Sequence, residues 1–352
     1  MNGKPSFDPC EIDRAIQRNL KGFGYLGSQG PAMGVSPKTL LYERGTLSLY
    51  HYLPLTREVY SVPLILVMAT SNKACVFDLA PGQSLIEFLL KRGHAVYAMD
   101  WNPPSGEERY LKIENYVLDF IPDSIQRVQQ HSGEDEVTLV GYCAGGLLSA
   151  LYAALHPAGP LKNLVCFTTP VDFREVTLYR AWTGARHCDV DRLVDAVGII
   201  QPDAVAAGFD VLRPASYAAA KVRLWENMWN NPYAEAFQQM ERWAGETLPL
   251  AGEYFRQFVR KFLRGNDLYE GELTIGGKRL NLADIEVPLL HVLARHDRIV
   301  PPKSARPLIE LVGSTDKEEL TLPGGHVSLF AGPNAVKRMW PKLHQWIGER
   351  SA

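Results

Sequence analysis

Short apolar runs of strand length alternate with helical segments through the first half of the chain. The expected strands are LILVMA (64–69), AVYAMD (95–100), VTLVGY (137–142) and LVCFTTP (164–170). The expected helices lie between them, in SLIEFLLKRG (84–93), residues 116–133 and LLSALYAALHP (147–157). A strand that is apolar at nearly every position is covered on both faces, as in parallel sheets with helical crossovers. The pattern therefore predicts an α/β fold with a mostly parallel central sheet and helices on both faces.

The chain before the first of these strands predicts an edge hairpin and an arm. The segment LLYERGTLSLYHYL (40–53) alternates apolar and polar residues around Arg44-Gly45, which is typical of two strands joined by a tight turn. Residues 1–39 are polar and interrupted by glycine and proline, apart from a short helical pattern over Glu11–Leu20. We expect an N-terminal arm rather than a separate domain.

The alternation of strands and helices stops after Pro170 and resumes near residue 285. Residues 173–284 are rich in Trp, Tyr, Phe, Arg and Ala at helical spacing and contain few strand-like runs. The core pattern then returns with a strand, a helix, a strand and a helix, at 288–294, 303–312, 319–322 and 335–351. We therefore expect an arm (1–39), an α/β core (40–172 and 285–352) and an inserted helical cap or lid (173–284).

The inserted segment carries large aromatic residues whose role the pattern leaves open. They are Trp182, Trp225, Trp229, Phe237 and Trp243. They could cover a site and guide an apolar chain, but we expect most of them to form the core of the cap itself. A cap that opens for substrate is a further hypothesis.

Composition and charge narrow the class of protein. Among 352 residues, 46% are hydrophobic and 22% charged, and Lys plus Arg (37) do not outnumber Asp plus Glu (39), so no basic surface for nucleic acid is expected. Five widely spaced cysteines resemble neither a disulfide framework nor a metal site. The first residues lack the apolar core of a signal peptide, and no apolar run is long enough for a transmembrane segment. We expect a cytoplasmic protein without a bound metal.

The sharpest chemical signal is the hexapeptide GYCAGG (141–146), which lies where an apolar strand ends and a helix begins. It matches the nucleophile elbow G-x-S-x-G with Cys143 in place of serine. Glycines at 141 and 145 are needed because this turn brings backbone atoms together. The amides and dipole of the following helix favour a thiolate at Cys143. The alternative is that Cys143 is a small buried residue before a glycine-rich turn.

Two further residues follow in the chain order of the α/β-hydrolase fold, which is nucleophile, acid, histidine. Asp297 comes after the apolar run 288–294, and His326 comes after ELTLPGG (319–325). Alone, each would be read as an ordinary loop residue. Together they predict a triad in which His326 takes the proton from Cys143 and Asp297 orients the imidazole. His296 could also line the site, although an ordinary loop position is the preferred interpretation.

Backbone amides should stabilise the oxyanion that forms when the nucleophile attacks a carbonyl. The N–H of Ala144, directly after the nucleophile, is the first candidate donor. The second should come from the loop after 64–69, within residues 69–72, and Thr70 is our candidate. A thiol nucleophile forms a thioester intermediate, which keeps the acyl group transferable. Transfer from coenzyme A (CoA) is therefore favoured over hydrolysis, provided that the cap excludes water.

Family-specific stretches accompany this triad over nearly the whole chain. They are GVSPK (34–38), residues 71–101, GYCAGG (141–146), TTPVDF (168–173), MERW (240–243), AGEYFRQFVRKF (251–262), LADIEVPLL (282–290), DRIVPP (297–302) and PGGH (323–326). With them the chain resembles polyhydroxyalkanoate (PHA) synthases, most closely the short catalytic subunit of the class III enzymes. The family's nucleophile, aspartate and histidine fall on Cys143, Asp297 and His326.

The resemblance implies growth of a polyester from (R)-3-hydroxyacyl-CoA, with CoA released at each step and no bound cofactor. It also implies that Asp297 helps to activate the incoming hydroxyl, that a second, non-catalytic synthase subunit serves full activity, and that the protein collects at the polyester granule surface. A homodimer is the alternative assembly. The chain departs from the family at Arg298, where relatives commonly have His, and at Ser328, where they commonly have Gly.

These departures keep a second reading open. A thioesterase or esterase, or an acyltransferase that passes one acyl group to a small acceptor, could use the same triad. A non-catalytic, granule-associated protein on a hydrolase scaffold is the third reading, and an intact triad argues against it.

Overall fold

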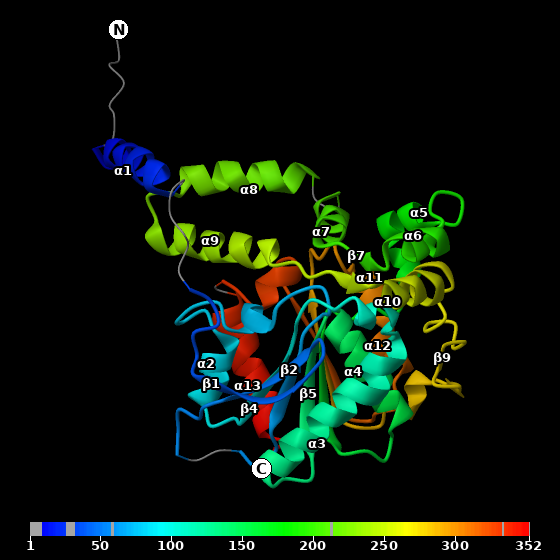
Figure 1. Cartoon of the computed structure of the whole chain (residues 1–352). Coiled ribbons are helices and arrows are strands. Elements are labelled where there is room, and N and C mark those ends of the chain that lie inside the picture. Colours follow the sequence, from blue (N-terminus) through cyan, green and yellow to red (C-terminus); the bar gives the residue numbers. More distant parts are fainter. Residues whose placement is uncertain (1–8, 26–31, 58–59, 212–213, 333, 352) are drawn as a thin grey trace.

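A computed structural model describes residues 9–25, 32–57, 60–211, 214–332 and 334–351 (Figure 1). Its centre is an eight-stranded sheet with the strand order β1-β2-β4-β3-β5-β6-β11-β12. The strands are β1 (Lys38–Arg44), β2 (Leu47–Tyr52), β3 (Leu64–Val67), β4 (Val96–Trp101), β5 (Val137–Tyr142), β6 (Leu161–Phe167), β11 (Leu289–Ala294) and β12 (Lys317–Leu322).

The sheet is parallel from β4 to β12 and antiparallel at one edge. The pairs β1–β2 and β2–β4 are antiparallel, whereas every neighbouring pair from β4 onward is parallel. The predicted edge hairpin is confirmed, and its turn begins at Gly45, whose positive φ of 54° suits glycine. The interior strands are buried at every position of β3, β4, β5 and β11, as their continuous apolar runs require.

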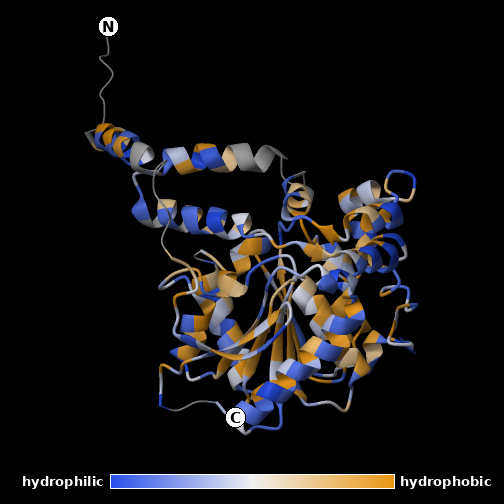
Figure 2. Cartoon of the chain, viewed as in Figure 1, coloured by the Kyte–Doolittle hydropathy of each residue, from blue (hydrophilic) through white to orange (hydrophobic). Residues whose placement is uncertain are grey.

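Helices cover both faces of the sheet (Figure 1). On one face lie α2 (Leu85–Leu90) and α13 (Trp340–Gly348), and on the other lie α3 (Ile121–Ser132), α4 (Ala144–Leu155) and α12 (Pro307–Leu311). Short turns complete the core, at η1 (Ala74–Phe77), η2 (Glu107–Tyr110), η4 (Phe173–Glu175), η6 (Leu282–Asp284) and η7 (His326–Leu329). Figure 2 shows apolar residues concentrated in the sheet and on the helix surfaces that face it.

Proline changes three of the predicted helices. The helix expected at 303–312 is divided into α11 (Pro302–Ala305) and α12, because Pro307 has no N–H to donate to the preceding turn. The helices α3 and α13 each carry proline at their second residue and are preceded by π-helical turns, η3 (Asn115–Phe120) and η8 (Ala335–Met339). A π-turn accommodates the missing hydrogen bond while the helix continues.

The segment between β6 and β11 contains mostly helices. They are α5 (Thr177–Thr183), α6 (Val190–Val197), α7 (Pro202–Val211), α8 (Pro214–Glu226), α9 (Asn231–Gly245), α10 (Gly252–Gln257) and the π-helical η5 (Phe258–Arg264). Two pairs of two-residue strands lie among them, β7 (Ile199–Ile200) with β8 (Leu250–Ala251) and β9 (Thr274–Ile275) with β10 (Lys278–Arg279).

The arm forms a helix, as predicted, and this helix packs on the cap. The helix is α1 (Pro9–Tyr25), and Figure 1 places it beside α8, away from the sheet. The guanidinium of Arg18 lies 5.7 Å from the ring centre of Trp225, and that of Arg14 lies 4.9 Å from the ring centre of Trp229. The cations of the arm thus cover two indole rings that the cap leaves open.

The expectation that most of the cap's large aromatic residues form its own core is wrong. Trp182, Trp225 and Trp229 are 37%, 44% and 36% exposed, whereas Trp243 is buried. Trp225 lies on α8 and Trp229 in the turn after it, where the cap projects from the body of the protein (Figure 1), and Trp182 lies on α5. Trp243, near the end of α9, instead packs in the main hydrophobic core. Within the described residues, no helix is long and apolar enough to cross a bilayer.

Candidate active site

The predicted nucleophile lies at a strained turn between β5 and α4. Cys143 follows the last residue of β5, precedes the first residue of α4 and has φ 54° and ψ −119°. Its N–H donates a hydrogen bond of 2.9 Å to the carbonyl of Phe167 at the end of β6. A positive φ in a non-glycine residue costs about 1–3 kcal/mol and persists only where neighbouring structure holds it. The half-buried thiol is therefore held at the carboxyl edge of the sheet.

The two glycines of the elbow are required by close packing of the backbone. A Cβ on Gly141 would clash with the backbone of Gly146, and a Cβ on Gly145 would clash with the carbonyls of Val67 and Met68. The first contact closes the turn, and the second brings the start of α4 against the end of β3. Glycine at both positions confirms the mechanical reason that the sequence suggested for them.

Asp297 and His326 come together from the ends of two neighbouring strands. Asp297 follows β11, His326 follows β12, and the His326 Nδ1 lies 2.6 Å from Asp297 Oδ2. The other carboxylate oxygen, Oδ1, accepts hydrogen bonds of 2.9 Å from the N–H groups of Ile299 and Val300. Both oxygens thus have partners, so the carboxylate has one orientation. The side chain of Asp297 has no exposed surface.

The electrostatic surroundings of His326 favour its protonated form. Burial alone lowers the pKa of this imidazole, but the Asp297 carboxylate and a charge and hydrogen bond from Cys143 raise it, and the net shift is upward. Because Nδ1 is committed to Asp297, Nε2 is the nitrogen that can serve the thiol. The ring of Tyr142 lies 4.9 Å from that of His326 and covers it. A raised histidine pKa favours a thiolate–imidazolium pair over a neutral thiol and imidazole.

The two candidate oxyanion donors flank the place where Gly145 packs against the carbonyls of Val67 and Met68. Ala144 is the first residue of α4, and Thr70 lies in the loop after β3 and is 6% exposed. Among the hydrogen bonds of the described residues, neither the Ala144 N–H nor the Thr70 N–H has an acceptor. Free amide N–H groups next to a nucleophile can donate hydrogen bonds to an anionic oxygen.

Two residues near this site were not identified from the sequence. Thr168, at the end of β6, has φ 43°, and its buried hydroxyl has no partner among the described residues. Tyr254, from α10 of the cap, is buried, and its burial, together with a smaller effect of the charge of Cys143, raises the pKa of its phenol to about 12, against a lowering effect of Thr70. Neither residue belongs to a sequence motif with a recognisable spacing. Both lie in stretches that the family resemblance singled out, TTPVDF and AGEYFRQFVRKF, and this was the available signal.

Other polar groups have weaker connections to the site. His296 is exposed, and its N–H donates to the carbonyl of Gly324, as an ordinary loop residue would. The hydroxyl of Ser328 donates to the carbonyl of Gly325, 2.6 Å away, within its own turn. In the part of the chain that the structure describes, no group of three His, Cys, Asp or Glu side chains could hold a metal ion.

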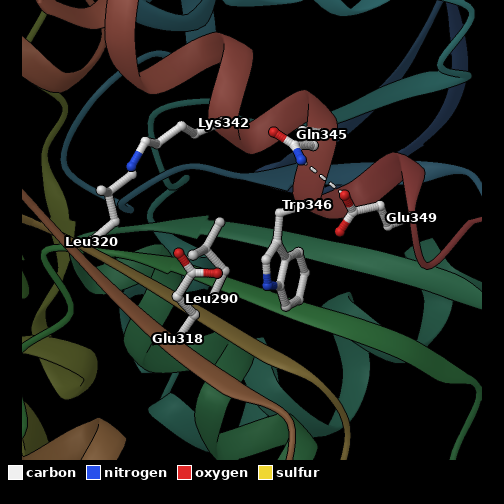
Figure 3. A pocket seen from close by; sticks show the side chains of 7 residues that line it. All are labelled: Leu290, Glu318, Leu320, Lys342, Gln345, Trp346 and Glu349. Carbon is white, nitrogen blue, oxygen red and sulfur yellow. Dashed lines mark hydrogen bonds between the residues drawn. The ribbon is translucent and has the colours of Figure 1, made fainter.

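A pocket of about 160 Å³ lies away from the triad, between α13 and the beginnings of β11 and β12 (Figure 3). Its wall includes Leu290 and Glu318, near the amino ends of the two strands, and Trp346 from α13. Cys143 lies at the carboxyl end of β5, and in parallel strands these two ends form opposite edges of the sheet. The pocket therefore takes no part in chemistry at the triad.

Two protein families match the chain. Residues 77–333 match the family described as alpha/beta hydrolase fold, and residues 28–89 match the N-terminus of poly-beta-hydroxybutyrate polymerase (PhaC). Solved structures share this fold at low identity. A monoacylglycerol lipase from Paleococcus ferrophilus is 16% identical with a TM-score of 0.54, covering 84% of this chain and 96% of that one. A monoglyceride lipase from Saccharomyces cerevisiae is 12% identical with a TM-score of 0.56, covering 92% and 98%.

Curated relatives are more similar in sequence. The poly(3-hydroxyalkanoate) polymerase subunit PhaC of Allochromatium vinosum is 34% identical over 332 residues, which cover 92% of this chain and 92% of the relative. The protein of the same name from Haloferax mediterranei is 32% identical over 322 residues, which cover 91% of this chain but only 65% of that longer relative. The matching region therefore spans almost the whole of one relative and about two thirds of the other.

Proposed function

The chain belongs to the poly(3-hydroxyalkanoate) polymerase family, and we propose that it extends a polyester by transferring 3-hydroxyacyl groups from CoA thioesters through Cys143. The observation that carries the proposal is a cysteine at the nucleophile elbow of an α/β-hydrolase fold, opposite a buried His–Asp pair. A thioester acyl-enzyme preserves the energy of the CoA thioester, and transfer of the acyl group needs that energy.

The first step is acylation of the enzyme. The thiolate of Cys143 attacks the carbonyl carbon of the hydroxyacyl-CoA, and the carbonyl oxygen becomes an oxyanion near the N–H groups of Ala144 and Thr70. The bond from carbon to the CoA sulfur then breaks. The departing thiolate takes a proton from the imidazolium of His326, so free CoA leaves and the hydroxyacyl group remains on Cys143.

The second step is transfer to a hydroxyl group. His326, now neutral, takes the proton of an incoming hydroxyl, and the resulting oxygen nucleophile attacks the acyl carbon on Cys143. An ester bond forms, and the Cys143 sulfur leaves as a thiolate beside the imidazolium. Both oxygens of Asp297 have protein partners and its side chain has no exposed surface, which supports action through His326 rather than direct contact with the hydroxyl.

The experiment that tests this proposal measures CoA release and the size of the product. Purified wild-type protein and Cys143→Ala receive (R)-3-hydroxybutyryl-CoA, with and without a class III partner subunit. We expect release that requires Cys143 and yields long ester chains. Free hydroxy acid would identify a thioesterase, and a single ester would identify a one-step acyltransferase. No CoA release under either condition would refute acyl transfer from this substrate.

Partners and location also belong to the proposal. We infer that the protein works with a second synthase subunit or as a homodimer, and that it is cytoplasmic and collects at the surface of polyester granules. Sedimentation of the purified protein, alone and with a candidate subunit, tests the first inference. Fractionation of granule-containing cells tests the second, and recovery only in the soluble fraction would contradict it.

A further inference from the structure

The loop that follows β11, residues 295–303, contacts both the acid and the nucleophile of the site. Within it, Asp297 lies 2.6 Å from the imidazole of His326. Val300 belongs to a small buried apolar cluster, and the half-buried Cys143 packs against that cluster. The inner side of this loop is therefore fixed beside the reacting groups.

The same loop exposes cations that have no partner. Arg295, Arg298 and Lys303 are exposed, and among the described residues none of the three makes an ion pair or a side-chain hydrogen bond. The next cation along the chain, Arg306, instead pairs with Glu319 at 3.2 Å. The cations nearest to Asp297 in the sequence are thus the ones whose charge is not neutralised by the protein.

The loop after β12 lies directly beside this one. The N–H of Arg295 donates to the carbonyl of Leu322 at 2.8 Å, and the N–H of His296 donates to the carbonyl of Gly324 at 2.9 Å. The two loops therefore form one continuous rim at the carboxyl edge of the sheet, on the side of the triad.

This rim carries an excess of positive charge. Residues 295–309 and 323–339 together contain six Lys or Arg residues, and Asp297 is their one acidic residue. That acid is buried against His326 and does not offset the exposed cations. The chain as a whole has 37 Lys and Arg against 39 Asp and Glu, so the excess is a property of the rim and not of the protein.

The charge and position of the rim fit one part of the proposed substrate. The nucleotide of CoA carries a pyrophosphate and a 3′-phosphate, and the long pantetheine arm separates these phosphates from the thioester. Groups that bind the phosphates therefore belong at the surface, with the reacting groups inside. Guanidinium groups bind phosphate oxygens through paired N–H donors, and exposed positive charge raises the local concentration of an anion.

Building on the acyl transfer proposed above, we propose that Arg295 and Arg298, with Lys303 beside them, dock the phosphates of the CoA nucleotide while the pantetheine arm reaches inward to Cys143. Arg298 is also one of the positions at which the chain departs from the family. The departure then has a consequence, since it adds a permanent positive charge next to the triad's acid.

Binding of free CoA tests this site without turnover. Arg295→Gln and Arg298→Gln each remove one charge and keep a polar side chain, and calorimetry should show CoA affinity about 3- to 10-fold lower in each. The double variant should lose more than either, and added salt should weaken CoA binding more in wild type than in the double variant. Arg223→Gln is the matched control, because it removes an exposed arginine from α8 on the projecting part of the cap (Figure 1).

Kinetics separate docking from a disturbance of the triad, which is needed because Arg298 adjoins Asp297. With 3-hydroxybutyryl-CoA, both single variants should raise KM by about the same factor as the loss of CoA affinity, with kcat nearly unchanged. With 3-hydroxybutyryl-pantetheine, which has the thioester but no nucleotide, they should match wild type. Equal losses with the two thioesters would point to a misplaced Asp297 and would overturn the proposal.

The docking site and the acyl transfer can fail separately. If wild type binds CoA through these arginines but releases none from the thioester, acyl transfer from this substrate fails and the docking site stands. No CoA binding by wild type, unchanged affinity in the double variant, or an equal loss in Arg223→Gln would each overturn the docking site.

Discussion

Replacing Asp297 by Asn should uncouple His326 from Cys143 while leaving the side chain's size unchanged. In the structure the carboxylate lies 2.6 Å from Nδ1 of a buried imidazole and is one of the groups that raise the pKa of His326 against the effect of burial. Loss of an opposite charge at this distance typically lowers a histidine pKa by about 1–3 units. Each unit of lost pKa makes the thiolate–imidazolium pair about 1.4 kcal/mol less stable relative to the neutral thiol and imidazole.

The assay is the rate of Cys143 alkylation by iodoacetamide as a function of pH. Because only the thiolate reacts, we expect the rate at neutral pH to fall by about tenfold per unit of lost pKa, and the profile to move to higher pH. Acyl transfer should fall by about 10³- to 10⁴-fold, because asparagine also permits the wrong imidazole tautomer. Asp316→Asn, which removes an exposed carboxylate paired with Arg350, is the control. An Asp297→Asn profile that matches wild type would refute the ion-pair reasoning.

The same pair should also make stability depend on pH. A raised pKa in the folded protein stabilises it fully below the unfolded pKa of about 6.5, and this contribution is lost as pH rises through the folded pKa. The difference in unfolding free energy between wild type and Asp297→Asn should therefore be largest in acid and shrink above neutral pH. Urea unfolding across this range measures it, and a difference that grows with pH would contradict the assignment.

Three other changes test particular contacts. Gly145→Ala should prevent folding or lower the melting temperature by several degrees, because its Cβ meets the carbonyls of Val67 and Met68; a wild-type melting temperature would contradict this packing. Trp243→Phe should cost about 0.5–1.5 kcal/mol of unfolding free energy, since the bond to the Lys73 carbonyl is lost; an unfolding free energy equal to wild type would contradict this contact. His291→Leu should stabilise the protein by about 1–3 kcal/mol, because both ring nitrogens of this buried residue have no partner among the described residues. Burial and the charge of Arg306 lower the pKa of His291 to about 3, so this variant should also lose less stability than wild type between about pH 6.5 and pH 3.

Local chemistry made much of the fold, the turn at Cys143 and the pairing of Asp297 with His326 predictable from the sequence. Continuous apolar runs require burial on both faces, so they predicted the parallel strands, and alternation around Arg44-Gly45 predicted the edge hairpin. The sequence GYCAGG predicted a strained turn, because a Cβ at Gly141 or Gly145 would meet backbone atoms that the turn brings close. Chain order then placed Asp297 and His326 at neighbouring strand ends, where the structure brings them within hydrogen-bonding distance.

The tertiary structure alone decided how the cap meets this site. Periodicity indicates that a residue is on a helix and which face is apolar, but it does not say which distant surface that face contacts. Thus Trp225 and Trp229, expected in the core of the cap, lie beneath cations of the arm, and Trp243 instead binds the loop after β3. The strained turn at Cys143 follows from rules that act within a few residues, whereas the hydrogen bonds between the cap and the loop after β3 form only when the cap packs on the core.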